Sequence, residues 1–210
     1  SRINVVCKLD YPGKEILMMV ESDFEYRVRL KSCKKEPEMV YWIETFFTEG
    51  QVLYDIGANT GAYSLVAASL FPGKLRVYSF EPAFQNYAQL CRNIMINNSS
   101  DWIVPIQVAL SADTTIQLFN YRTLIPGSAV HSLGEAINHI GESFTPTLSQ
   151  PTLSYRADDF IEQFNLPMPN HIKIDVDGIE YSVVKGLDKA LNSPTVQSLF
   201  LELNPERGEK

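Results

Sequence analysis

Acids and glycines in one short stretch of this chain could bind a small cationic ligand. The motif LYDIGANTGAYS places Asp55, Gly57, Asn59 and Gly61 between an apolar run and a helix-like run. Glycines at a strand-to-helix turn usually leave backbone N–H groups open to a nucleotide. Asp55 argues against a phosphate, because a nearby anion would repel a pyrophosphate by about 1 kcal/mol or more. The motif favours a nucleoside with an ammonium and no phosphate, such as S-adenosylmethionine, although Asp55 could also cap the helix.

A second acid has the position expected for a ribose-binding residue. Glu81 ends the apolar run YSF and follows Gly61 by twenty residues. An acid at the end of a second strand can accept hydrogen bonds from both ribose hydroxyls. A solvated helix start is the alternative, because Pro82 fits the first turn of a helix. The pairing with Asp55 favours the ligand-binding role.

The motif IKIDVDGIE, at 172–180, brings two more acids to the end of a strand. Strand alternation places Asp175 and Asp177 on one side, with Lys173 in phase. These acids could shape a cofactor and acceptor pocket, or bind a divalent metal with an acid such as Glu202, or Asp177 could cap the next helix. Because the spacing fixes no third ligand, we predict the pocket and no metal.

The elements that must position these residues alternate between strands and helices from residue 51 onward. Near-continuous apolar strands joined by helices are typical of a parallel sheet that is covered on both faces. The pattern therefore predicts an α/β fold with a doubly wound, mostly parallel, Rossmann-like sheet. The strands are expected at 52–56, 75–80, 102–110, 172–176 and 196–203, and the helices at 61–71, 83–98, 157–165 and 179–191.

The first fifty residues are expected to form an extension of strands and one helix. Alternating runs at 15–22 and 24–31 indicate one or two strands, and apolar residues at helical spacing over 37–50 indicate an amphipathic helix. We predict an extension at 1–50 packed on a domain at 51–210, together one structural unit.

The region 111–156 breaks the strand and helix rhythm. Two alternating runs, 115–121 and 151–157, flank a polar segment at 122–150. A segment of that length is more often a lid or binding element than an idle connection, with local disorder as the alternative. His131 lies in this segment and could act as a base above the pocket. His139 and His171 are expected to be structural.

Composition limits the classes of function. The net charge of -7 argues against a nucleic-acid or membrane-surface binder, which needs a basic footprint. No apolar run reaches the eighteen or so residues of a membrane span. Three cysteines without paired spacing suggest neither a disulfide framework nor a metal knuckle, so a reducing, cytoplasmic compartment is expected.

Taken in order, DIGANTGAYS, FEP, a helix ending in N-x-x-x-N, VALS and IKIDVDGIE resemble the FkbM family of S-adenosylmethionine-dependent methyltransferases. The resemblance covers roughly 38–202 and implies a class I methyltransferase fold. Asp177 stands where the family pattern usually has Glu. The residues that match the family's cofactor site are Asp55, Gly57, Asn59 and Gly61 in the loop, Glu81 at the ribose, and Ala109 and Leu110 at the adenine wall.

The family further implies O-methylation of a hydroxyl on a sugar or natural product. A hydroxyl needs a general base, for which Asp175, Asp177 and His131 are the candidates. The expected partner is a small-molecule or glycan acceptor, with no nucleic acid and no membrane, and the oligomeric state is not indicated. A nicotinamide-dependent oxidoreductase and a non-catalytic cofactor-binding domain are the alternatives.

Overall fold

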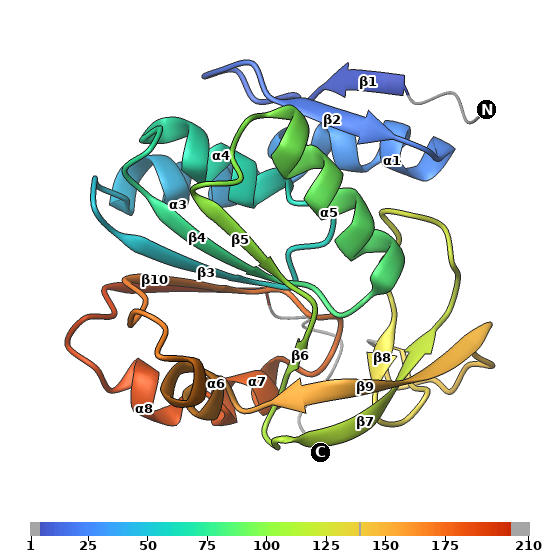
Figure 1. Ribbon diagram of the computed structural model, residues 1–210. Helices are drawn as coiled ribbons and strands as arrows, with labels where there is room; N and C mark the ends of the chain where they lie inside the picture. The colour runs from blue at the N-terminus through green and yellow to red at the C-terminus, as the bar shows by residue number, and fades with distance from the viewer. Residues whose placement is uncertain (1–4, 139, 203–210) are drawn as a thin grey trace.

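A five-stranded parallel sheet forms the centre of the molecule (Figure 1). The computed structural model describes residues 5–138 and 140–202. The strands lie in the order β11-β10-β3-β4-β5, so the chain reverses its direction of travel between β3 and β10. Ligands of such sheets bind beyond the carboxyl ends of the strands at this reversal. The strands are β3 (Val52–Ile56), β4 (Arg76–Phe80), β5 (Ile103–Ile106), β10 (His171–Ile174) and β11 (Ser198–Leu201).

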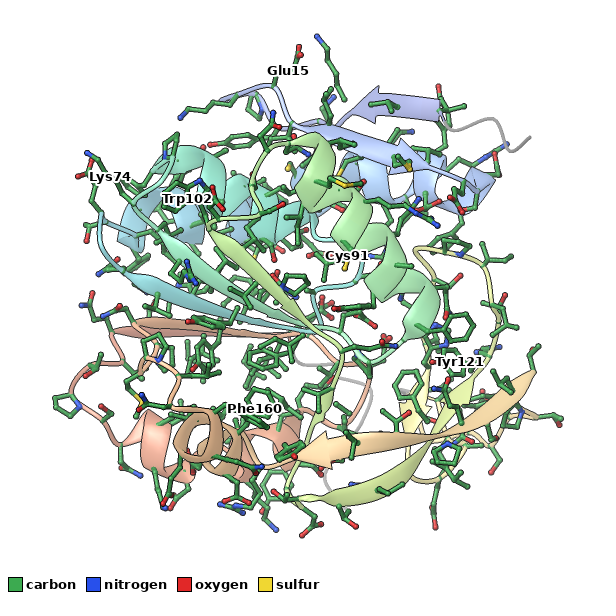
Figure 2. The ribbon with its side chains drawn as sticks, viewed as in Figure 1. Glu15, Lys74, Cys91, Trp102, Tyr121 and Phe160 are labelled. Carbon is green, nitrogen blue, oxygen red and sulfur yellow. The ribbon has the colours of Figure 1, made fainter. Side chains whose placement is uncertain are left out.

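Helices cover both faces of this sheet, as the apolar strands predicted (Figure 1). Alternate residues of β3 enter two apolar clusters, with Leu53 on one face and Tyr54 and Ile56 on the other. Phe160 lies on the second face of the sheet (Figure 2). Its ring centroid is 5.7 Å from that of Phe80. One layer contains α3 (Pro37–Phe46), α4 (Ala62–Leu70) and α5 (Phe84–Ile96), and the other contains α6 (Ala157–Phe164), α7 (Glu180–Lys185) and α8 (Asp188–Leu191).

The predicted strand at 102–110 is divided between two sheets. Its first part is β5, which is an edge strand and therefore tolerates Pro105. Its second part, β6 (Ala109–Leu110), belongs to a four-stranded sheet of order β6-β9-β7-β8. Likewise, the predicted helix at 179–191 is interrupted after α7 and resumes as α8.

The two alternating runs of the region 111–156 form the antiparallel strands β7 (Thr115–Tyr121) and β9 (Leu148–Tyr155). The chain between them includes β8 (Ser132–Leu133), which pairs with β7. Part of the polar segment 122–150 is therefore a strand of the second sheet, and His131 immediately precedes this strand.

The N-terminal extension contains a hairpin of β1 (Val5–Lys8) and β2 (Leu17–Val20). The strand predicted at 24–31 is wrong, because these residues form α1 (Asp23–Arg27) and the 3₁₀ helix η1 (Arg29–Lys31). A capping box starts α1: Ser22 Oγ accepts from the Glu25 N–H, and the Glu25 carboxylate accepts from the Ser22 N–H. This local signal outweighs the alternation of apolar residues. A short helix, α2 (Ser32–Lys35), leads into α3.

The N-x-x-x-N motif of α5 attaches the extension to the rest of the fold. Asn93 Oδ1 accepts from the Met19 N–H at 2.7 Å, and Asn97 Oδ1 accepts from the Leu17 N–H at 2.9 Å. Asn93 Nδ2 also donates to the carbonyl of Thr60, at 2.9 Å, in the turn after β3. One helix therefore fixes both the extension and that turn. The two parts share an apolar cluster, and the division at residue 50 stays a prediction.

His171 has a structural environment, as the sequence suggested. Its buried ring stacks on Phe47 with centroids 4.1 Å apart, and its nitrogen atoms lie 2.8 Å from Ser198 Oγ and from Gln51 Oε1. His139 lies outside the described residues. Within the part of the chain that the structure describes, none of the helices has both the length and the apolar character needed to cross a bilayer.

Candidate cofactor and catalytic site

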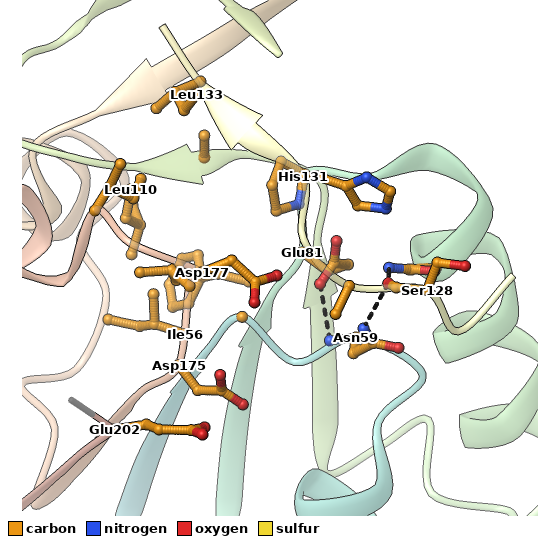
Figure 3. Close-up of a pocket in the computed structure, with 18 of the residues that line it drawn as sticks. Ile56, Asn59, Glu81, Leu110, Ser128, His131, Leu133, Asp175, Asp177 and Glu202 are labelled. Atoms are coloured by element: carbon orange, nitrogen blue, oxygen red, sulfur yellow. Dashed lines mark hydrogen bonds between the residues drawn. The ribbon is translucent and has the colours of Figure 1, made fainter. Parts of the chain in front are cut away.

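A cavity of about 370 Å³ lies at the carboxyl ends of β3, β4 and β10 (Figure 3). This volume falls within the range of small-molecule sites. Segments from five parts of the fold line the cavity: the turn after β3, the start of the loop after β4, residues 108–110, residues 128–133, and the chain after β10. The short helices of the N-terminal extension complete it.

Most of the predicted site residues lie together around this cavity. Asp55 and Gly61 do not line it. The residues that do are Gly57, Asn59, Glu81, Ala109, Leu110, His131, Asp175 and Asp177.

Asp55 lies below the cavity, where a buried lysine neutralises its charge. Lys173 Nζ is 3.0 Å from Asp55 Oδ1 and 3.5 Å from Asp175 Oδ2. The same ammonium donates to the Gly57 carbonyl at 3.0 Å, and Ser64 Oγ donates to Asp55 Oδ2 at 2.5 Å. The structure thus differs from the expectation that Asp55 meets the ligand directly. Because Asp55 is paired, it cannot by itself discriminate against a phosphate.

The two acids beside Lys173 keep this lysine charged. Burial lowers the pKa of Lys173, but Asp55 and Asp175 outweigh that effect and hold its pKa above the usual value. Burial likewise raises the pKa of Asp175, and the attraction of Lys173 more than compensates, so the net pKa is lowered. Asp175 is therefore an ionised carboxylate whose charge is paired with that of Lys173.

Gly57 is required by the approach of β10 to the turn. Its φ is +77°, and an added Cβ would lie 1.8 Å from the carbonyl oxygen of Asp175. Any larger residue would separate the two chain segments whose ends carry Asp55 and Asp175. Gly61 marks the start of α4 and packs against Leu90 of α5. The glycine spacing therefore reflects packing within the protein as well as access to a ligand.

Glu81 is held in a fixed position by two backbone donors. Its Oε2 accepts from the Asn59 N–H at 2.8 Å (Figure 3). Its Oε1 accepts from the Ala83 N–H at 2.9 Å. Burial raises the pKa of Glu81 to about 7, although both N–H groups oppose the shift. Each carboxylate oxygen has a second lone pair, so Glu81 can also accept hydrogen bonds from ligand hydroxyls.

Part of the long polar segment lies over the cavity, where three side chains hold its backbone. The Ser128 carbonyl accepts from Asn59 Nδ2 at 3.1 Å and from Asn86 Nδ2 at 3.0 Å. Asp177 Oδ2 accepts from the Val130 N–H at 2.6 Å. The side-chain N–H group of Asn59, a residue of the predicted cofactor loop, thus binds this segment.

His131 lines the cavity, but its hydrogen bonding does not suit a general base. Its Nδ1 accepts from the Arg122 N–H at 3.3 Å, so the neutral ring carries its proton on Nε2. Nε2 is buried and has no hydrogen-bond partner. Burial, assisted by the positive charge of Arg29, lowers the pKa of His131 to about 4. The ring is therefore neutral at pH 7, with its free lone pair already engaged.

A group of three acids lies at one side of the cavity. Glu36, Asp175 and Glu202 each bring one oxygen within 4.8 Å of the others, which is a geometry that a metal ion could use. Two of them already contact protein cations, since Lys35 lies 2.6 Å from Glu36 and Lys173 lies 3.5 Å from Asp175. Burial and the neighbouring Asp175 raise the pKa of Glu202 to about 7. The expectation of a site without metal stays a prediction.

The N-terminal helices supply cavity residues that sequence reasoning missed. Arg29, Lys35 and Glu36 reach the cavity from η1, α2 and the start of α3. No local motif marks them, because their position depends on the attachment of the extension to α5. Asn86 was also missed, although it follows FEP by only four residues and could have been examined with that motif.

Comparison with known proteins places the chain in a family. Residues 55–210 match the family described as the methyltransferase FkbM domain. The chain belongs to the FkbM methyltransferase family. This confirms the resemblance drawn from DIGANTG and IKIDVDGIE.

Two curated relatives have modest identity to this chain. The hexuronic acid methyltransferase AglP of Haloferax volcanii is 25% identical over 165 residues, covering 79% of this chain and 62% of the relative. Methyltransferase sdnD of Sordaria araneosa is 26% identical over 157 residues, covering 65% of this chain and 60% of the relative. The chain therefore spans about three fifths of the length of these relatives. Both are methyltransferases, and neither supports the nicotinamide alternative.

A solved structure confirms the class I methyltransferase fold. The S-adenosylmethionine-dependent methyltransferase of Agrobacterium tumefaciens superposes with a TM-score of 0.50 at 14% identity, covering 93% of this chain and 51% of that one. At this identity the likeness concerns the fold alone. It agrees with the sheet order and the two helical layers described above.

The buried lysine gives a stability prediction. Lys173→Met should destabilise the protein by about 3–5 kcal/mol, because it leaves the buried Asp55 carboxylate without a countercharge. The double variant Lys173→Met/Asp55→Asn should recover part of this loss. Urea unfolding monitored by circular dichroism measures both. A loss below about 1 kcal/mol in the single variant would show that Lys173 does not hold the site together.

Proposed function

We propose that this chain is an S-adenosylmethionine-dependent methyltransferase that methylates a hydroxyl of a sugar or natural-product acceptor. The observation that carries the proposal is the cavity at the reversal of the sheet, where the turn after β3 and the fixed carboxylate of Glu81 meet. Membership in the FkbM family supports it. A relative named for hexuronic acid supports the sugar acceptor.

The charge of the cavity favours this cofactor over a dinucleotide. Among the described residues, two cations, Arg29 and Lys35, share the lining with the carboxylates of Glu36, Glu81, Asp175, Asp177 and Glu202. Such an excess of acids attracts a sulfonium and an ammonium but repels a pyrophosphate. Selection against phosphate therefore rests on the whole lining rather than on Asp55.

The residues around the cavity fit the parts of the cofactor. Glu81 can accept from the ribose hydroxyls, the turn containing Gly57 and Asn59 offers a place for the amino-acid end, and Ala109 and Leu110 form an apolar wall for adenine. S-adenosylmethionine, when bound, supplies an activated methyl group. The main task of the protein is then to align the acceptor, and such positioning can lower a barrier by several kcal/mol.

Asp177 is the candidate that best fits the role of general base. Burial raises the pKa of Asp177, so its carboxylate has a stronger tendency to take a proton. Asp175 is a weaker candidate because Lys173 stabilises its charge, and His131 offers a proton rather than a lone pair. Asp177 Oδ2 is held by the Val130 N–H, which fixes the carboxylate in the cavity wall. It would accept the hydroxyl proton of the acceptor as the new bond forms.

The partner and the compartment also remain proposals. The partner is a small-molecule or glycan acceptor, since the net charge of -7 does not suit a nucleic acid or an anionic membrane. A reducing, cytoplasmic location agrees with the free cysteines Cys7, Cys33 and Cys91.

Calorimetry tests the cofactor assignment. The chain should bind S-adenosylmethionine and S-adenosylhomocysteine but not NAD. Glu81→Gln should weaken the affinity for both S-adenosyl ligands by about tenfold or more, because a charged hydrogen-bond acceptor is lost. Since the pKa of Glu81 is about 7, its ionised fraction grows with pH. The cationic S-adenosylmethionine favours the ionised form of Glu81, so its affinity for the unaltered chain should rise from about pH 6 to about pH 8. In Glu81→Gln this rise of the affinity with pH should be smaller. Binding of NAD with equal affinity would refute the assignment.

Methyl transfer from labelled cofactor to a panel of sugars tests the base. Asp177→Asn should lower kcat by about 10²- to 10⁴-fold, the usual contribution of a general base, with little change in cofactor affinity. His131→Gln, which keeps a donor, should retain most of the rate. If His131→Gln loses the rate and Asp177→Asn keeps it, the assignment is wrong.

A further inference from the structure

We propose that Arg29 of the N-terminal extension binds a ligand carboxylate in the cavity. The inference rests on the proposed function and goes beyond it, because neither the sequence motifs nor the family match, which begins at residue 55, includes Arg29. The class of ligand is a carboxylate, which both the amino-acid end of the cofactor and an acidic acceptor can provide.

Within the described part of the chain, Arg29 is held in place through Nε and not through its terminal nitrogen atoms. Its Nε donates to the Gly127 carbonyl at 2.6 Å, and its guanidinium carbon lies 5.7 Å from the centroid of the Phe24 ring. Gly127 permits this approach, because an added Cβ would lie 3.2 Å from Arg29 Cγ and 2.6 Å from Glu25 Cγ. Residues 127 and 128 thus join the extension to the Asn59 and Asn86 side chains, and Arg29 is fixed at the cavity wall.

Arg29 also has no carboxylate partner among the described residues. Of the other cations at this site, Lys35 lies 2.6 Å from Glu36, and Lys173 is buried between Asp55 and Asp175. Arg29 forms no ion pair within 4.0 Å in the described ranges 5–138 and 140–202. In a cavity lined by five acids, a ligand carboxylate would be repelled unless it met this guanidinium. A guanidinium also offers two parallel donors to a carboxylate.

The orphaned atom of His131 supports the same conclusion. Nε2 is a buried donor without a partner, and His131 lines the cavity together with Arg29. A buried donor that stays unpaired is costly, so a ligand oxygen is its natural partner. Among the described residues, Arg29 and His131 are thus two lining side chains with donors that no protein acceptor takes, and they indicate where an anionic or oxygen-rich group of the ligand belongs.

The test compares ligands that differ in the carboxylate. S-adenosylhomocysteine carries the amino-acid end, and 5′-methylthioadenosine keeps the nucleoside but lacks that end. Methyl β-D-glucuronide and methyl β-D-glucoside form the matching pair for an acidic acceptor, measured on the chain loaded with S-adenosylhomocysteine. Calorimetry with Arg29→Gln measures each affinity, and Arg27→Gln is the control, since Arg27 is exposed, pairs with Asp23 and does not line the cavity.

Arg29→Gln should weaken one carboxylate ligand by about 10- to 100-fold and leave its carboxylate-free counterpart unchanged, as expected for loss of a charged hydrogen bond. A loss for S-adenosylhomocysteine alone assigns Arg29 to the cofactor, and a loss for the glucuronide alone assigns it to the acceptor. Equal weakening of S-adenosylhomocysteine and 5′-methylthioadenosine, or no change for any ligand, overturns the proposal while the proposed function stands. Failure of the unaltered chain to bind S-adenosylhomocysteine overturns both. Thermal midpoints of the two variants show whether either is unfolded.

Discussion

The ammonium of Lys173 holds the whole site together. It lies between Asp55 at the end of β3 and Asp175 after β10, and it also binds the carbonyl of Gly57 in the turn. A buried charge is tolerated only when opposite charges and hydrogen bonds surround it, and here both come from the two strands that flank the reversal of the sheet. The pairing explains why acids occur in both motifs. They position the turn and the cavity wall, and in the proposed function the ligand contacts two other acids, Glu81 and Asp177.

The N-terminal extension is the second constraint on the site. Its hairpin is bound by Asn93 and Asn97 of α5, and this attachment carries η1 to the cavity mouth. Asn93 also donates to the carbonyl of Thr60 in the turn after β3. The turn and the N-terminal helices both line the cavity, and both are therefore held by α5. The position of the turn and the position of Arg29 are therefore linked through α5. This link accounts for an asparagine motif that has no contact with the cavity itself.

Sequence reasoning succeeded where strand and helix periods differ, and it failed at one local signal and at contacts between distant segments. The apolar runs predicted β3 and α4 closely, because strand and helix periods differ and glycines separate them. The capping box at Ser22 was overlooked, so α1 was mistaken for a strand. The split of 102–110 between two sheets, the pairing of Asp55 with Lys173 and the arrival of Arg29 depend on contacts between distant segments. No spacing rule within one chain segment encodes them.

A crystal structure of the chain with S-adenosylhomocysteine tests the account most directly. We expect the ribose hydroxyls on Glu81, the amino-acid end above the turn at Gly57 and Asn59, and the Lys173 contacts with Asp55 and Asp175 unchanged beneath it. A ligand whose ammonium displaced Lys173 to bind Asp55, or one bound away from Glu81, would contradict the account.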